Sequence, residues 1–208
     1  LHNAWAWKYG STLKSDLSYN LSKVIATFPF PGHENSKLES IGESFHKKRE
    51  NYMKENKIGL TDFFNYFNEP SDNEIKLIRE LLIELDENVL IAYDWYKDSD
   101  KWGKAIQLRH DFYELDYLPE NDRVRYTIHP DARKEVLKRL LLLNHERFEE
   151  EVTKGLHKRK DVVAYFEQKG KPIPEGTQFS DGKAKKSTPK KTKIRKTEPP
   201  KEQYGLFD

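Results

Sequence analysis

Hydroxyl, cationic and aromatic side chains crowd the first twenty residues of the chain, and their chemistry suits contact with a polyanion. Lysine ammonium groups can neutralise phosphates, and serine and threonine hydroxyls can donate hydrogen bonds to phosphate oxygens. The carboxylate of Asp16 can accept a hydrogen bond from cytosine N4, or it can orient Lys14. These features predict a DNA-binding segment formed by Trp7, Lys8, Tyr9, Ser11, Thr12, Lys14, Ser15, Asp16 and Tyr19.

The aromatic residues of this segment also fit a hydrophobic core, because aromatic side chains dominate core packing. In that alternative Trp5, Trp7, Tyr19 and the two phenylalanines of Phe28-Pro29-Phe30 are buried, and the serines cap local structure. Residue types alone leave both alternatives open.

Two further stretches carry concentrated positive charge. Lys47, Lys48, Arg49 and Lys54 fall on one predicted helix, where a charged outer face is usually only solvated. Residues 182–208 hold nine Lys or Arg against three acids. A flexible polycation of this kind attracts DNA without sequence preference, although it also fits a solubilising extension or a linker.

The final residues, QYGLFD, resemble the bacterial sliding-clamp binding peptide, which places a glutamine before a Leu-Phe pair. Gln203, Leu206 and Phe207 fit that pattern, whereas Tyr204 departs from the usual leucine. Apolar anchors at the end of an extended arm suit capture in a preformed pocket, so a sliding clamp is a candidate partner.

Composition excludes several classes of function. The chain has no cysteine, which removes disulfides and thiolate chemistry, and its seven histidines lack metal-ligand spacing. An acid at Asp131 followed by Glu167 and Lys169 is similar to a nuclease pattern, but both pieces fall in predicted helices. No signal peptide or membrane span is evident, so a cytoplasmic location is expected.

Charge divides the chain into blocks and predicts three segments. Net charge, counted as the number of Lys and Arg less the number of Asp and Glu, is +3 over 1–60, −8 over 61–128, +1 over 129–181 and +6 over 182–208. The expected order is the end of a target-recognition segment at 1–33, a helical unit at 34–175, and a disordered Lys-rich tail at 176–208. The predicted fold is mainly α with a small β-hairpin (α+β).

Local patterns place the helices and one hairpin. Ser-x-x-Glu capping boxes at 36–39 and 71–74 each predict a helix start, and Gly59 is expected to end the first helix. In the second helix, apolar residues predict a buried stripe and charged residues predict an outer face that includes Arg79. The stripe comprises Ile75, Ile78, Leu82, Leu85 and Val89, widened by Leu77 and Leu81.

Short apolar alternations at 108–128 surround the turn-like Pro-Glu-Asn-Asp and predict a β-hairpin. Pro130 fits the first position of a helix that runs to the low 150s, and 162–166 adds one or two more helical turns.

The run LHNAWAWKYGSTLKSDLSYNLSKVIATFPFP resembles the target-recognition and C-terminal region of large adenine-specific DNA methyltransferases. These are the enzymes fused into type IIG or IIL (MmeI-like) restriction-modification systems, and PglX-like methylases of phage-defence systems look similar. The stretches 59–70, 77–95 and 139–147 are similar to later landmarks of the same region. The resemblance covers about residues 1–150.

The resemblance implies a parent enzyme whose chemistry lies upstream of Leu1. Neither the glycine-containing S-adenosylmethionine loop nor the Asn-Pro-Pro-Tyr type motif of the family occurs in these 208 residues. A leucine start with Met53 as the single methionine also predicts an excerpt of a longer chain. No catalytic residue and no cofactor site is therefore expected in 1–208, and S-adenosylmethionine belongs to the parent.

The predicted function is DNA recognition and scaffolding for a site-specific adenine-N6 methyltransferase, with double-stranded DNA and the upstream methyltransferase domain as partners. Whether the parent also cleaves DNA stays open. The alternative is a non-catalytic structural and interaction module, in which only the basic tail contacts DNA or a clamp.

Overall fold

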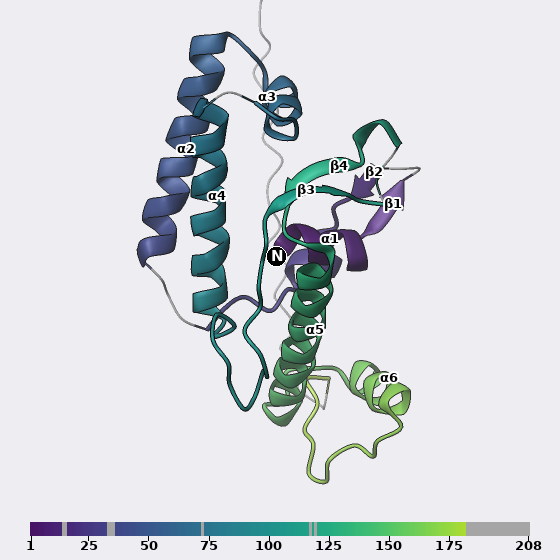
Figure 1. Cartoon of the computed structure of the whole chain (residues 1–208). Coiled ribbons are helices and arrows are strands. Elements are labelled where there is room, and N and C mark those ends of the chain that lie inside the picture. Colours follow the sequence, from purple (N-terminus) through teal and green to yellow (C-terminus); the bar gives the residue numbers. More distant parts are fainter. Residues whose placement is uncertain (14–15, 33–35, 72, 117, 119, 182–208) are drawn as a thin grey trace, which may run out of the picture. The chain divides into compact units, whose positions relative to one another are not determined.

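The structure, a computed structural model, describes residues 1–13, 16–32, 36–71, 73–116, 118 and 120–181 (Figure 1). The chain divides into two compact units, Leu1–Glu150 and Glu151–Asp208, called unit 1 and unit 2 below. The fold is mostly helical with small antiparallel β-hairpins, which confirms the predicted class. No helix in the described ranges has both the length and the apolarity needed to cross a membrane.

Three helices form one part of unit 1. Helices α2 (Ser36–Asn56) and α4 (Asn73–Ala92) lie side by side in antiparallel directions, and the short α3 (Leu60–Phe67) connects them (Figure 1). Their shared contact is an aromatic and aliphatic cluster, because each helix has an apolar face at helical spacing. The buried members are Tyr52, Phe63, Phe67, Ile75 and Ile78.

The end of α2 differs from the prediction. Lys57, not Gly59, takes the left-handed conformation that closes the helix, with φ of 53°. The N–H of Ile58 donates to the Met53 carbonyl at 3.0 Å, which satisfies a carbonyl that the helix end leaves free. Gly59 instead precedes α3 in an extended conformation. The preference of glycine for helix ends therefore predicted the end of α2 two residues too late.

The apolar stripe of α4 is confirmed at Ile75 and Ile78, but two expectations for this helix are wrong. Leu77 is 48% exposed, so it does not widen the buried face. Arg79, expected on the outer face, is only 5% exposed. Its guanidinium donates to backbone carbonyls at the C-terminal end of α3, which compensates for its removal from water.

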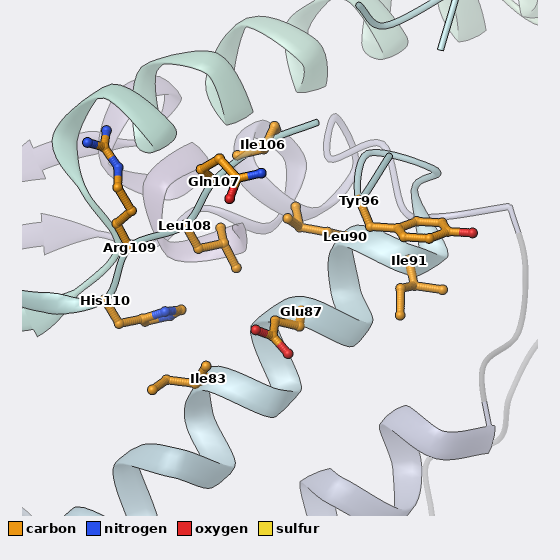
Figure 2. Close-up of a pocket in the computed structure, with 10 residues that line it drawn as sticks. All are labelled: Ile83, Glu87, Leu90, Ile91, Tyr96, Ile106, Gln107, Leu108, Arg109 and His110. Carbon is orange, nitrogen blue, oxygen red and sulfur yellow. The ribbon is translucent and has the colours of Figure 1, made fainter. Parts of the chain in front are cut away.

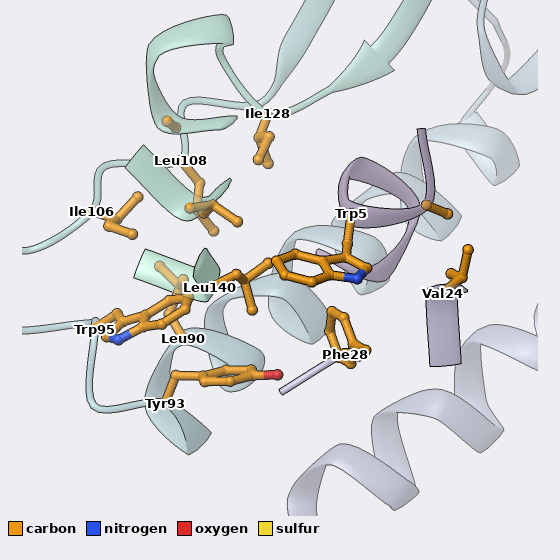
Figure 3. Close-up of a cluster of buried hydrophobic side chains, with 13 residues drawn as sticks. Trp5, Val24, Phe28, Leu90, Tyr93, Trp95, Ile106, Leu108, Ile128 and Leu140 are labelled. Atoms are coloured by element: carbon orange, nitrogen blue, oxygen red, sulfur yellow. The ribbon is translucent and has the colours of Figure 1, made fainter. Parts of the chain in front are cut away.

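A second core joins segments from both ends of unit 1 (Figure 3). Trp5 from α1 (His2–Tyr9) and Trp95 from the segment after α4 are 2% and 0% exposed. Helix α5 (Pro130–Thr153) contributes Val136 and Leu140 to the same cluster. The other buried members are Ala6, Val24, Phe28, Leu90, Tyr93, Ile106, Leu108, Ile128 and Ala132.

The described residues of unit 1 form two antiparallel hairpins. The predicted one pairs β3 (Asp111–Glu114) with β4 (Val124–Thr127), with the short 3₁₀ helix η2 (Glu120–Asp122) in the connection. The other pairs β1 (Ser11–Leu13) with β2 (Asp16–Ser18) and precedes a single π-helical turn, η1 (Leu21–Ile25). Three-residue strands give too little alternation for a sequence pattern to reveal them.

Unit 2 consists of the last turn of α5, helix α6 (Arg159–Lys169) and the segment that returns from it. Helix α6 buries Val162 and Phe166 and ends at Gly170, whose φ is 62°. This confirms the helical prediction around 162–166. Residues 176–181 of the predicted tail fold back on this unit, and 182–208 lie outside the described residues.

Candidate nucleic-acid interface

The β1–β2 hairpin lies within the predicted DNA-binding segment. Its register pairs Ser11 with Ser18, Thr12 with Leu17, and Leu13 with Asp16. The connection is therefore only Lys14-Ser15, two residues that fall outside the described part of the chain. The side chains of Thr12 and Asp16 fall outside it as well.

Gly10 joins α1 to this hairpin at a close approach. A Cβ atom added there would lie 2.4 Å from the Ala6 carbonyl oxygen and 3.1 Å from Leu17 Cδ1. The N–H of Gly10 donates to that same Ala6 carbonyl at 2.8 Å. Since Leu17 also packs against the large core, the hairpin is held at its base by α1 and by the core.

The described side chains of the predicted site fall into two environments. Lys8 and Tyr19 are exposed, with Tyr19 at 47%, and the Tyr19 hydroxyl is hydrogen-bonded to His2 Nε2 at 2.5 Å. Trp7 and Ser11 are half-buried. An exposed lysine and an exposed, hydrogen-bonded tyrosine therefore flank the hairpin in the sequence.

Tyr9 belongs to the second environment. Its ring centroid is 4.2 Å from that of Trp5, it packs against the large core, and burial raises the pKa of its hydroxyl. Trp5 and Phe28 are themselves buried, whereas Phe30 is 52% exposed. For Trp5 and Phe28 the core alternative is therefore confirmed.

Two of the basic side chains on α2 form ion pairs within the same helix. Lys47 Nζ lies 3.6 Å from Glu43 Oε2, and Lys54 Nζ lies 2.7 Å from Glu50 Oε1. The hydrogen bond from Lys54 lowers the pKa of Glu50. Such i,i+4 pairs neutralise part of the charge that a phosphate would need.

A pocket of about 490 Å³ lies between α4 and the segment 106–110 (Figure 2). Sequence reasoning did not find it, because its two walls come from segments far apart in the chain. The imidazole of His110 is buried and lies 2.9 Å from the Asp86 carboxylate, so it is already engaged. The lining residues, which include no serine, threonine or cysteine, are Ile83, Glu87, Leu90, Ile91, Tyr96, Ile106, Gln107, Leu108, Arg109 and His110.

Metal chemistry finds no support in the described ranges, where no group of three or more His, Asp or Glu side chains could hold an ion. The clamp-binding residues Gln203, Leu206 and Phe207 lie beyond those ranges. Comparisons of the chain with known protein families, curated proteins and solved structures found no match.

Proposed function

We propose that this chain is the C-terminal DNA-recognition and scaffold portion of an S-adenosylmethionine-dependent adenine-N6 DNA methyltransferase from a restriction-modification or phage-defence system. The observation that carries the proposal is the β1–β2 hairpin within the segment that resembles the target-recognition region. A two-stranded ribbon is one of the two elements that the major groove of duplex DNA admits.

In this proposal some residues of the hairpin and its flanks contact phosphates and others lie nearer the bases. Lys8, Ser11, Thr12 and Lys14 contact phosphates and set the register on the duplex, with the half-buried Trp7 and the hydroxyl of Ser15 beside them. Asp16 and Tyr19 lie nearer the bases. The bond between Tyr19 and His2 supports that role, because it restricts the tyrosine to one orientation before DNA arrives.

Catalysis belongs to the parent enzyme in this proposal. By resemblance, the parent flips an adenine out of the duplex and transfers a methyl group to it from S-adenosylmethionine. The helices of unit 1 serve to hold the hairpin, since α1 and β2 are anchored to the large core through Trp5 and Leu17.

The test is a duplex-binding titration with the variant Lys14→Ala. We expect weaker binding and a plot of log affinity against log salt that is less steep by about 0.9, the change for one lost phosphate contact. Lys76→Ala is the matched control, because Lys76 is an exposed lysine on α4. An affinity that stays at the wild-type value across the salt range would remove Lys14 from the interface.

A second candidate function is favoured by the burial of Trp5 and the packing of Tyr9. In it the chain is a structural module that docks on the methyltransferase domain, and only the tail meets DNA or a sliding clamp. Truncation after Asp181 separates the two candidates. Sequence preference that persists in the truncated chain supports recognition by the hairpin, whereas complete loss of DNA binding supports the structural module.

A further inference from the structure

The pocket between α4 and the segment 106–110 has the size and lining of a small-molecule site (Figure 2). Its volume of about 490 Å³ falls within the range of about 300–1,000 Å³ that organic ligands occupy in proteins. Five of its ten lining residues are Leu or Ile. Three of these, Leu90, Ile106 and Leu108, are buried members of the large core, so the floor of the pocket is apolar.

Exposed apolar side chains lie at the rim of the same pocket. Ile91 is 42% exposed and Tyr96 is 46% exposed, and both line it. Large apolar side chains that gather at a concave site, rather than singly on the surface, are typical of binding sites. An apolar ligand body would therefore remove apolar surface from water at both the floor and the rim.

Three hydrogen bonds hold the walls of the pocket in place. The Ile106 N–H donates to the Trp95 carbonyl at 3.1 Å, and the carbonyl of Leu108 accepts from a backbone N–H at the start of α5 at 2.8 Å. His110 Nε2 lies 2.9 Å from Asp86 Oδ2, which joins the segment 106–110 directly to α4. The pocket is therefore formed before a ligand binds, which reduces the entropy cost of binding.

Two polar side chains of the pocket are available to a ligand. Within the described ranges, the Glu87 carboxylate and the Gln107 amide have no ion-pair or hydrogen-bond partner. Glu87 lies between Ile83 and Ile91 at spacings of four residues, so all three share one face of α4 (Figure 2). The carboxylate is thus placed beside apolar side chains that a ligand would cover.

The sign of the charge in the pocket is set by Glu87. The Arg109 guanidinium is directed toward the start of α5, away from Glu87 (Figure 2), and lies 2.9 Å from His129 Nδ1 and 3.9 Å from Asp131. All ten lining residues also belong to the block 61–128, whose net charge is −8. Both the nearest free charge and the surrounding block favour a cation over an anion.

We propose that this pocket binds a small amphipathic amine, whose protonated nitrogen pairs with Glu87 while its apolar body packs against the Leu and Ile side chains. The amide oxygen of Gln107 can accept a second hydrogen bond from the ammonium group. The Tyr96 ring at the rim also suits a cation, since Lys97 Nζ already lies 5.3 Å from its centroid. The proposal does not depend on DNA recognition, because the pocket shares no residue with the β1–β2 hairpin or its flanks.

The experiment is a protein NMR titration of the full, isotope-labelled chain with three probes of one shape and different charge. Tryptamine is the cation, propylindole is its uncharged isostere, and indole propionate is the anion. Probes of about a dozen heavy atoms bind weakly, so the titration extends to about 10 mM. Shifted backbone amide signals locate the site, and the spectra of the variants verify that they are folded.

Glu87→Gln removes the charge and keeps the shape of the side chain. We expect tryptamine to bind this variant about tenfold more weakly than the wild type, the effect of losing one charged hydrogen bond. Propylindole should bind the wild type more weakly than tryptamine does and should be unaffected by Glu87→Gln. Glu80→Gln is the matched control, because it removes the same charge from an exposed position of α4 outside the pocket and should leave tryptamine binding unchanged.

Ile91→Arg tests the apolar rim at an exposed position where a substitution leaves the core intact. The new guanidinium lies four residues after Glu87, so it can pair with that carboxylate and cover the opening. Binding of tryptamine and of propylindole should both be lost. The proposal is overturned by tryptamine binding that is equal in Glu87→Gln and the wild type, by indole propionate binding as tightly as tryptamine, or by shifts that lie outside residues 83–110. Absence of binding for every probe also overturns it.

Discussion

The two hairpins of unit 1 have the same topology and differ in what holds them. The β3–β4 hairpin packs over buried Arg79, whose guanidinium carbon lies 4.8 Å from the Phe112 ring centroid and 5.0 Å from that of Tyr126. The Tyr126 N–H also donates to Asn68 Oδ1 at 3.0 Å. Contacts from Arg79 of α4 and from Asn68, just after α3, therefore hold this hairpin at its Phe112–Tyr126 pair.

The β1–β2 hairpin is held by α1 and by the large core instead. Gly10 and Leu17 attach it to α1 and the core, and the His2–Tyr19 bond anchors the residue that follows it. The two hairpins therefore have different anchors within one unit. The first is part of the scaffold, and we propose that the second contacts DNA.

The largest expected effect comes from removing the guanidinium under β3–β4. Arg79→Ala leaves the carbonyls of Tyr66, Phe67 and Glu69 without their buried donor, and we expect a loss of about 3 kcal/mol in the free energy of unfolding. Chemical denaturation measures it. Lys76→Ala on the exposed face of the same helix is the control, and an equally small change in both would show that Arg79 does not hold the hairpin.

A smaller effect is expected where β1–β2 meets α1. Gly10→Ala places a methyl group 2.4 Å from a backbone oxygen, so the chain must shift, at a cost of about 1–3 kcal/mol. Gly32→Ala is the matched control, because a Cβ atom there meets nothing within 4 Å. If the β1–β2 hairpin contacts DNA, Gly10→Ala also weakens duplex binding. Arg79→Lys, which keeps a donor and the charge beneath the β3–β4 hairpin, should leave duplex binding closer to that of the wild type.

The smallest expected effect is a dependence on alkaline pH. Burial raises the pKa of Tyr126 above its ordinary value of 10.0. Its hydroxyl ionises first in the unfolded chain, so its contribution to stability is complete below that value and is lost as pH rises through the folded-state pKa. The free energy of unfolding is measured by denaturation at pH 8 and at about pH 10.5. It should fall less between these two pH values in Tyr126→Phe than in the wild type.

Much of the secondary structure could be predicted from local patterns. The spacing of Ile75 and Ile78 identified α4, Pro130 marked the start of α5, and the turn-like residues near 119–122 separated β3 from β4. Each of these signals depends on residues within one or two helical turns, or within one strand, of each other. Such signals depend on backbone sterics and amphipathic periodicity, which act over short stretches of sequence.

The candidate site could be predicted only in part. Lys8 and Tyr19 are exposed near the hairpin as a DNA contact requires, whereas Tyr9 packs on Trp5. Composition could not separate these residues, because an aromatic ring suits a core and a DNA surface equally well. Nor could it reveal the β1–β2 pairing, which depends on contacts at Gly10 and Leu17.

The amino-acid sequence by itself determined where helices α4 and α5 and the β3–β4 hairpin form, and how charge is distributed along the chain. Only the tertiary structure decided that Arg79 is buried, that Trp5 and Trp95 share one core, and that Asp181 accepts a hydrogen bond from the Arg159 N–H. The physical reason is the separation along the sequence over which each interaction acts. Periodicity and capping act between near neighbours, whereas burial and charge pairing depend on residues that folding brings together from distant parts of the chain.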